Sequence, residues 1–230
     1  MSGNSIIQKL EGGLVVSCQA PVESPMHQPQ VITAMAEAAI NQGAVGVRLD
    51  TPAHVKAVRQ KVLMPIIGLW KQQIPGFEVY ITPQFHHAAA IAQAGADIIA
   101  IDATLRSRPN QETVATLIAR IHTELGKQVM ADVDTLEAAI AAADAGADLV
   151  GTTLYSYTPD TQYLTPPGFD LLTELVEKLE VPIICEGGIA SAQMAKQALD
   201  RGAYAVVVGT AITGIDLQVK AYTTALSPKH

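Results

Sequence analysis

The chain has 230 residues, 49% of them hydrophobic and 16% charged, which excludes an intrinsically disordered chain. Its formal net charge of −7 and its aromatic content of 4% are the opposite of the basic, stacking surfaces that bind nucleic acids, so we expect no nucleic-acid partner. No apolar run approaches the roughly 20 residues that a membrane-spanning helix needs, so we expect no membrane association.

A helix-ending Gly-Ala pair followed by a short apolar run occurs four times, at Gly43, Gly95, Gly146 and Gly202. Glycine suits the left-handed turn after a helix, and the apolar run has the composition of a buried parallel strand. Four further apolar runs alternate with these copies. In chain order the predicted strands lie in the segments GLVVSC, GAVGVRLD, PIIGLW, GADIIAID, QVMADV, GADLVGTT, VPIICEG and GAYAVVVGT.

The segments between these runs have apolar residues at helical spacing. We expect helices over residues 31–42, 52–61, 86–94, 112–125, 136–145, 169–179, 192–201 and 215–225. Thr135 and Ser191 stand directly before two of them, where residues that cap helix N-termini belong. Two connections, residues 72–83 and 155–168, are longer than a strand–helix unit requires, and we expect them to form loops over a site.

Strand–helix units that follow one another without a linker favour one closed (β/α)8 barrel of the α/β class, with residues 1–230 as a single domain. The alternative is an open, doubly wound sheet. That fold usually carries a G-x-G-x-x-G motif after its first strand, and the segment after Val16 has none. We therefore expect a TIM barrel with its chemistry at the C-terminal ends of the strands.

Polar residues stand where the predicted strands end. They are Gln19, Arg48, Lys71, Asp102 with Thr104, Asp132, Thr153, Glu186 and Gly209-Thr210. A charged group at the end of an apolar run costs several kcal/mol unless it is paired or meets water. The concentration of such groups at one end of a barrel favours an active site over separate ion pairs. Asp102 and Asp132 fit two roles, binding substrate hydroxyls or ordering neighbouring basic side chains, and Thr153 is a candidate substrate contact.

Lys71 and Glu186 are the most informative pair, because the third and seventh strands of an eight-stranded ring stand opposite each other. A lysine acts as a base near neutral pH only when its pKa is lowered by about three units, which burial and a nearby Arg48 would favour. Burial beside Ile184 and Cys185 would raise the pKa of Glu186. Two such groups across a bound sugar suit removal and return of a proton at carbon. The alternative without chemistry is a direct Lys71–Glu186 salt bridge.

Two glycine-containing loops point to a phosphate site. The segment EGGI ends the seventh predicted strand, and VGTA ends the eighth. In TIM barrels the loops after these strands, with the N-terminus of a short helix, form the usual phosphate cradle. Glycine lets backbone N–H groups approach an anion without a Cβ in between. The candidate phosphate-binding residues are Gly187, Gly188, Gly209 and Thr210.

No group of residues in the sequence has metal-ligand spacing, so we expect no metal site. His86 and His87 are adjacent, and adjacent side chains on a helix are expected to point apart. The remaining histidines are scattered. Trp70, directly before Lys71, fits either core packing or a wall of a sugar pocket.

Several separate segments match one known family: GGLVVSCQ, GAVGVRLD, PIIGLWK, ADIIAIDATLRSRP, VMADVDT, LVGTTLYSYT, ICEGGI and AVVVGTAIT. Over residues 13–212 the chain resembles the N-acetylmannosamine-6-phosphate 2-epimerases. The resemblance implies a TIM barrel that interconverts N-acetylmannosamine 6-phosphate and N-acetylglucosamine 6-phosphate without a metal or organic cofactor. It also implies that Lys71 is the catalytic lysine and Glu186 the catalytic glutamate. The substrate contacts that it implies are Gln19, Arg48 and Asp132.

Three residues depart from the pattern that is common in that family. Gln72 and Gly214 stand where relatives commonly have Arg, and Gly188 stands where they often have a larger residue. Losing a guanidinium that binds phosphate costs about 1.5–3 kcal/mol per charge-assisted bond, so these loops decide the phosphate preference. Two other interpretations stay open: a different phosphosugar isomerase or synthase on the same barrel, and a non-catalytic phosphosugar-binding sensor.

Two further features concern the surroundings of the protein. The last predicted helix carries Tyr222 and Leu226 in positions that look exposed, and together with the resemblance this favours a homodimer. Cys18 and Cys185 lie far apart in the sequence, which fits buried free thiols in a reducing compartment. We therefore expect a cytoplasmic protein.

Overall fold

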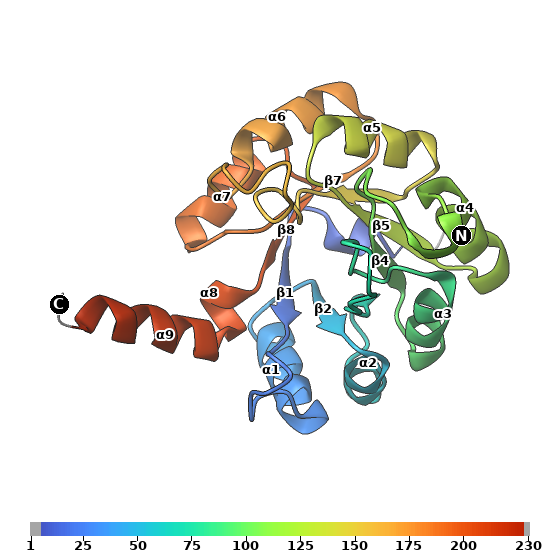
Figure 1. The fold of residues 1–230 in the computed structure, drawn as a ribbon. Helices are drawn as coiled ribbons and strands as arrows, with labels where there is room; N and C mark the ends of the chain where they lie inside the picture. The colour runs from blue at the N-terminus through green and yellow to red at the C-terminus, as the bar shows by residue number, and fades with distance from the viewer. Residues whose placement is uncertain (1–5, 228–230) are drawn as a thin grey trace.

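The computed structural model describes residues 6–227, which fold into a closed barrel of eight parallel strands (Figure 1). Neighbouring strands pair in chain order, and β8 closes the ring against β1. The strands are β1 Leu14–Cys18, β2 Gly46–Asp50, β3 Ile66–Leu69, β4 Ile98–Asp102, β5 Gln128–Asp132, β6 Leu149–Gly151, β7 Ile183–Glu186 and β8 Ala205–Val208. This order confirms the predicted (β/α)8 TIM barrel and excludes the open sheet.

A helix follows each strand, and a further helix follows the short one after β8. The helices are α1 Pro29–Asn41, α2 Pro52–Arg59, α3 Phe85–Ala94, α4 Val114–Arg120, α5 Leu136–Asp144, α6 Phe169–Lys178, α7 Ala192–Asp200, α8 Thr210–Thr213 and α9 Ile215–Leu226. The two predicted caps are confirmed, because Thr135 and Ser191 accept hydrogen bonds from backbone N–H groups of α5 and α7. Across residues 6–227 no helix has both the length and the apolar character to cross a membrane.

The fourth predicted helix begins later than its periodicity indicates. A 3-10 turn, η2 (Pro109–Gln111), precedes α4, and within it Asn110 and Gln111 have φ angles of 58° and 56°. Positive φ interrupts a right-handed helix, so the chain turns before α4 can start. A π-helical turn, η3 (Ile121–Leu125), then ends the segment. Apolar spacing in the sequence does not report the sign of φ, which is why the boundary was misplaced.

The strands bury side chains on both faces, which is why their sequences are continuously apolar. One cluster fills the lumen of the barrel, and Leu10 of the turn η1 (Gln8–Leu10) joins it from the N-terminal side. A larger cluster joins the outer faces of the strands to the helices. Because the lumen is packed with side chains, ligand chemistry is confined to the mouth at the C-terminal ends of the strands.

The repeated glycines adopt the left-handed conformation that their position predicts. Gly95 caps α3 with a φ of +108°, and a Cβ on it would lie 2.8 Å from Cγ of Arg59. Gly43, Gly146 and Gly202 also have positive φ. These residues let the chain reverse from a helix into the next strand without a steric penalty.

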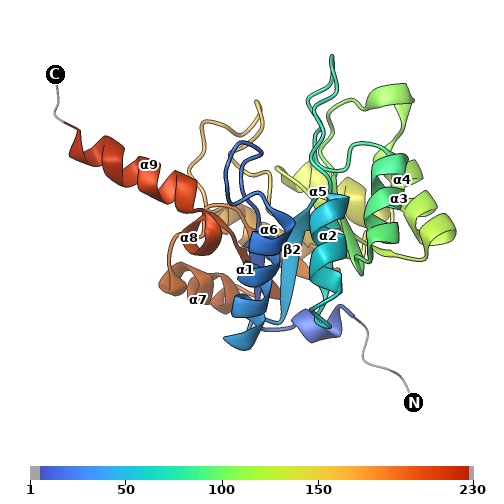
Figure 2. The same ribbon diagram turned by 90° about the horizontal axis from the view of Figure 1, so that it is seen from below.

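The loops after β1, β3 and β6 rise at the same end of the barrel (Figure 2). The loop after β3 forms a hairpin in which Lys71 pairs in antiparallel fashion with Ile81, and the N–H of Gln72 donates to the carbonyl of Tyr80 at 2.9 Å. The predicted loops over residues 72–83 and 155–168 therefore both stand at the mouth.

The last helix, α9, does not pack on the barrel. Figures 1 and 2 show it projecting outward from α8, away from the ring of helices. All its residues are exposed except Gln218, which is half-buried. The helix carries apolar side chains on this exposed surface, among them Tyr222 (71% exposed) and Leu226 (81% exposed).

Candidate active site

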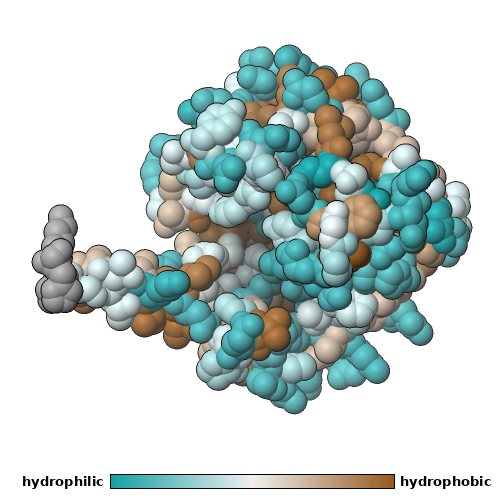
Figure 3. All heavy atoms as spheres, in the orientation of Figure 1, coloured by the Kyte–Doolittle hydropathy of each residue, from teal (hydrophilic) through white to brown (hydrophobic). Residues whose placement is uncertain are grey.

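A cavity of about 920 Å³ lies at the C-terminal mouth of the barrel. Figure 3 shows the molecule hollowed between its central loops and the start of the projecting helix. The predicted site residues that line this cavity are Gln19, Arg48, Lys71, Thr153, Glu186, Gly187, Gly188, Gly209 and Thr210. Trp70 lines it too, so it forms part of the wall as well as packing on the core. The structure thus brings together residues from six strand ends.

Arg48 is held at the floor of the cavity by two carboxylates. Its Nη1 and Nη2 donate to Oδ1 and Oδ2 of Asp132 at 3.0 and 2.6 Å, and Nη1 lies 2.9 Å from Oε2 of Glu186. Asp132 has no exposed surface and does not line the cavity. Of the two roles open to Asp132, the geometry shows the ordering of a basic side chain, and it places the carboxylate behind Arg48.

Glu186 lies at the end of β7 with its side chain 12% exposed. Burial raises its pKa from 4.5 to about 7, although the charge of Arg48 opposes this shift. The hydroxyl of Thr153 donates to Oδ1 of Asp132 at 2.6 Å and stands 3.3 Å from Oε2 of Glu186. The raised pKa agrees with the sequence-based expectation, and it makes Glu186 able to exchange a proton near neutral pH.

Lys71 follows β3 and extends into the cavity. Its Nζ donates to Oε1 of Gln19 at 2.6 Å, and its backbone N–H donates to Oδ1 of Asp50 at 2.9 Å. No ion pair joins Lys71 to Glu186, so the direct salt bridge is not formed. Desolvation by the surrounding protein lowers the pKa of Lys71, Asp50 acts in the opposite direction, and Arg48 adds to the lowering. Because the side chain meets water in the cavity, this desolvation is partial.

The loops after β7 and β8 form the glycine-rich side of the cavity. Gly187 and Gly188 have φ angles of 99° and 71°, and a Cβ on Gly188 would lie 2.4 Å from Cβ of Pro166. This contact explains why the chain has no larger residue at this position. Gly209 precedes α8, whose first residue is Thr210. Backbone N–H groups are therefore available to an anion on this side.

The departures from the common family pattern also border the cavity. Gln72 and Gly214 both line it, and Gln72 Nε2 donates to the carbonyl of its neighbour Lys71 at 2.8 Å. Arg48 and Lys71 are the only Lys or Arg residues among the described residues that line the cavity, and neither belongs to the β7–β8 side. Asp216, in the first turn of α9, adds a carboxylate to the lining.

Sequence reasoning missed several residues of the lining, among them Asp50, Tyr80 and Tyr157. Asp50 had a usable signal, because it stands two residues after Arg48 and alternate residues of a strand share a face. Tyr80 and Tyr157 come from loops, whose paths have no periodic pattern in the sequence.

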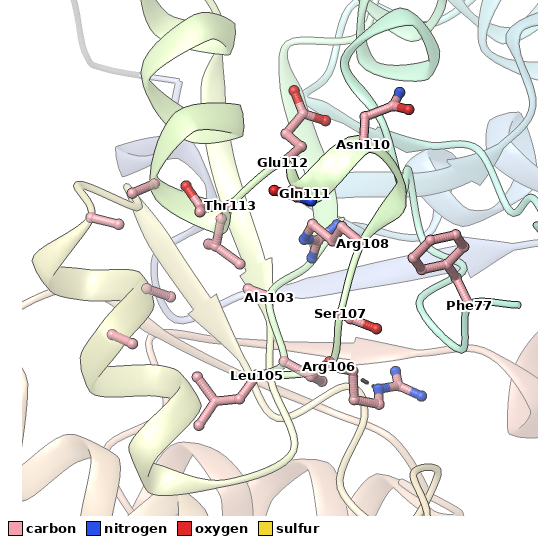
Figure 4. Close-up of a pocket in the computed structure, with 16 residues that line it drawn as sticks. Phe77, Ala103, Leu105, Arg106, Ser107, Arg108, Asn110, Gln111, Glu112 and Thr113 are labelled. Atoms are coloured by element: carbon pink, nitrogen blue, oxygen red, sulfur yellow. Dashed lines mark hydrogen bonds between the residues drawn. The ribbon is translucent and has the colours of Figure 1, made fainter.

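A second cavity, of about 760 Å³, lies beside the loop between β4 and α4 (Figure 4). Its lining includes Thr104, one of the polar residues at the predicted strand ends, but none of the residues proposed for catalysis, substrate binding or phosphate binding. Asp102, below this loop, accepts hydrogen bonds from Thr104 Oγ1 at 2.7 Å and from Arg106 Nη2 at 2.8 Å. Of the two roles considered for Asp102, the structure shows the ordering of a basic neighbour.

The adjacent histidines differ from expectation. The rings of His86 and His87 lie 3.8 Å apart between centroids instead of pointing apart. Both belong to the first turn of α3, where no preceding turn restricts the side chains. Across residues 6–227 no group of three or more His, Cys, Asp or Glu residues is arranged to hold a metal ion.

The closed barrel, with a lysine and a glutamate of shifted pKa in its mouth, defines an enzyme of the (β/α)8-barrel class. Over residues 32–228 the chain matches the family described as "Putative N-acetylmannosamine-6-phosphate epimerase". The chain belongs to this family.

Known relatives and structures agree with this placement. A protein of Synechococcus elongatus named "Putative N-acetylmannosamine-6-phosphate 2-epimerase" is 64% identical over 225 residues, which cover 97% of each chain. A protein of the same name from Caldanaerobacter subterraneus is 45% identical and covers 90% of this chain and 88% of its own. The solved N-acetylmannosamine-6-phosphate 2-epimerase of Clostridium perfringens is 38% identical, covers 96% of both chains and superposes with a TM-score of 0.92.

Proposed function

We propose that the protein interconverts N-acetylmannosamine 6-phosphate and N-acetylglucosamine 6-phosphate by exchanging the proton at C2. Family membership supports this function, and the observation that carries its chemistry is the Lys71 ammonium, which reaches the cavity with Gln19 as its side-chain partner. Residues 1–230 then act as one catalytic domain that needs no metal or organic cofactor.

The reaction is a proton transfer at carbon. The sugar opens to its aldehyde, whose carbonyl makes the C2 proton acidic. Lys71, in its neutral form, takes that proton, and the electron pair of the C–H bond forms an enolate with the C1 carbonyl, while C2 keeps its acetamido group. A proton returned to the opposite face of C2 gives the epimer, so atoms and charge balance. The lowered pKa of Lys71 supports its role as the base.

Arg48 is the group that stabilises the negative oxygen in this mechanism. Asp132 and Glu186 fix its guanidinium, so the charge is already in place when the enolate forms. Gln19 orients Nζ of Lys71, and Thr153 supports the carboxylate cluster. In this assignment Asp132 acts on the substrate through Arg48.

Two routes can return the proton. Glu186, with a pKa of about 7, can supply it from the opposite side of the mouth, or Lys71 can return the proton it took. Comparing Glu186→Gln with the unchanged protein in D₂O separates these routes. If Glu186 is the donor, deuterium still enters C2 of the substrate while formation of the epimer stops; if Lys71 serves both faces, exchange and epimerisation fall together.

The backbone around Gly187, Gly188, Gly209 and Thr210 is the proposed phosphate cradle. It offers N–H donors and the start of α8, with no Lys or Arg from the described lining on that side. Binding through neutral donors is weaker than binding through guanidinium groups. We therefore expect a smaller preference for the phosphorylated sugar than an arginine-bearing cradle would give.

Two further proposals concern the setting of the enzyme. The free thiols of Cys18 and Cys185 are both buried, which supports a reducing cytoplasm. Four apolar residues of α9 fall on one helical face, at positions 215, 219, 222 and 226, and each is more than half exposed. We propose that this stripe packs on a second copy of the chain, because α9 projects away from the ring of helices and the neighbouring α7 buries only Ala198.

The test is proton NMR of the purified protein with N-acetylmannosamine 6-phosphate in D₂O. We expect C2-deuterated N-acetylglucosamine 6-phosphate to appear, and Lys71→Met to abolish it while binding of the sugar phosphate persists. Near-normal turnover by Lys71→Met would exclude Lys71 as the base. Reaction of the unphosphorylated sugar alone would indicate a different sugar enzyme, and tight binding without exchange would indicate a sensor.

A further inference from the structure

Asp50 is the last residue of β2 and shares a strand face with Arg48. Its side chain is half-buried and lines the cavity beside Lys71. β2 and β3 pair in register up to Asp50 and Leu69, where β3 ends. Asp50 therefore stands where the regular pairing of these strands stops and the chain continues into Lys71.

The carboxylate of Asp50 extends this pairing by one residue. Its Oδ1 accepts the backbone N–H of Lys71 at 2.9 Å, while the next residue, Thr51, donates its N–H to the carbonyl of Leu69 at 3.0 Å. On its other side Lys71 pairs with Ile81 of the hairpin. The backbone of Lys71 is thus fixed from both sides, and on one of them by a side chain.

The charge of Asp50 is not neutralised by a direct partner. Asp132 and Glu186 both form ion pairs with Arg48, whereas no ion pair among residues 6–227 includes Asp50. The groups that act on Lys71 by charge are Asp50 and Arg48 from β2, Glu186 from β7 and Asp132 from β5, and Asp50 is the strongest of them. Burial raises the pKa of Asp50 itself, and the charges of Lys71 and of His54 of α2 act against this rise.

We propose that Asp50 is a positioning residue for Lys71: it holds the backbone at the end of β3, and its negative charge stabilises the ammonium that forms when Lys71 takes the C2 proton. This role deepens the proposed function and rests on it. The charge matters most at the moment of transfer, because Nζ goes from neutral to positive. Partial desolvation in the cavity weakens Lys71 as a base, and the carboxylate restores part of its basicity.

Asp50→Asn separates the two parts of this role. The amide has the same shape and keeps an oxygen that accepts the N–H of Lys71, but it removes the negative charge. On the plateau of the pH profile, where Lys71 is already neutral, we expect kcat to fall about threefold to tenfold with KM little changed, because the charge acts on the transferred proton. The acid limb of the pH profile of kcat should move to lower pH by about one unit, because a lysine without a nearby carboxylate loses its proton more easily. Asp50→Ala removes the hydrogen-bond acceptor as well, so its kcat should fall further than that of Asp50→Asn.

The direct measurement is a pH titration of Lys71 by carbon-13 NMR in protein labelled at the lysine Cε, with Lys71→Met identifying the signal. We expect the pKa of Lys71 to be lower in Asp50→Asn than in the unchanged protein. Asp216→Asn is the matched control, since it removes another carboxylate that lines the cavity, and it should leave this pKa in place. Equal pKa values in Asp50→Asn and the unchanged protein would overturn the proposal, as would an equal shift in Asp216→Asn.

The titration needs no turnover, so it separates the two hypotheses. A lowered pKa of Lys71 in a protein without C2 exchange would show the coupling and reject the proposed function. C2 exchange with an unchanged pKa and an unchanged pH profile in Asp50→Asn would support the function and reject the role of Asp50.

Discussion

Arg48 and Asp132 form a two-pronged ion pair beneath the cavity, with Nη2 and Oδ2 2.6 Å apart and side chains that are 2% and 0% exposed. The pair comes from β2 and β5, which do not neighbour each other in the barrel. The pair therefore crosses the top of the lumen. It stabilises the fold and also fixes the orientation of Arg48, which faces the cavity.

Replacing Asp132 with Asn should lower both stability and turnover. Breaking a buried pair outright costs about 3–5 kcal/mol, and because Arg48 keeps Glu186 as a partner the loss here should be at or below that range. Chemical denaturation gives the stability, and the D₂O assay gives the turnover. Arg48→Met combined with Asp132→Asn is the control, and it should recover part of the stability while turnover stays low. If the double variant loses as much free energy of unfolding as Arg48→Met and Asp132→Asn lose together, the coupling is contradicted.

The strand ends that form the site were predictable from the sequence because parallel strands in a barrel all end at one mouth. The position of a residue along a strand does not show, however, how far below the cavity its side chain lies. Asp132 was expected to contact the substrate, and the structure places it behind Arg48 without exposed surface. Tyr80 reaches the cavity because a hairpin returns beside Lys71, and such a turn depends on backbone hydrogen bonds that no apolar pattern encodes.

The pH dependence of stability should carry a contribution from Glu186. Its pKa is raised from 4.5 to about 7, so the folded protein holds this proton more tightly than the unfolded chain does. Such a group stabilises the fold fully below the unfolded pKa, and the contribution is lost as the pH rises through the folded pKa. Between about pH 4.5 and 7 the free energy of unfolding should therefore fall relative to that of Glu186→Gln. Denaturant titrations at several pH values measure the free energy of unfolding of both proteins. If it changes with pH equally in both, Glu186 makes no such contribution.

Gln72→Arg should strengthen recognition of the phosphate. Gln72 lines the cavity directly after Lys71, and a guanidinium there would add a charge-assisted bond worth about 1.5–3 kcal/mol. We expect a lower KM for the phosphorylated sugar and little change for the unphosphorylated one, measured in the same NMR assay. Equal effects on both sugars would mean that the new side chain does not reach the phosphate.

Gly214 does not offer the same route. A Cβ on it would lie 2.7 Å from Cα and 2.9 Å from the carbonyl oxygen of Thr210, and both atoms are backbone. Gly214→Arg should therefore distort the junction between α8 and α9 and lower stability instead of raising affinity. Gly214→Ala is the control, because it adds the Cβ without a charge and should lower the melting temperature to a similar extent.

The apolar stripe of α9 should control assembly. Ile215, Val219, Tyr222 and Leu226 lie on one face and are 51%, 55%, 71% and 81% exposed. A charge placed in an interface core is left without water, so Tyr222→Lys with Leu226→Glu should shift a dimer to monomers. Sedimentation velocity measures the shift. Lys220, on the same exposed helix but outside the stripe, gives the control Lys220→Glu, which should leave the association unchanged. A monomeric unchanged protein would reject the proposed dimer, and a dimer that survives the double substitution would place the interface elsewhere.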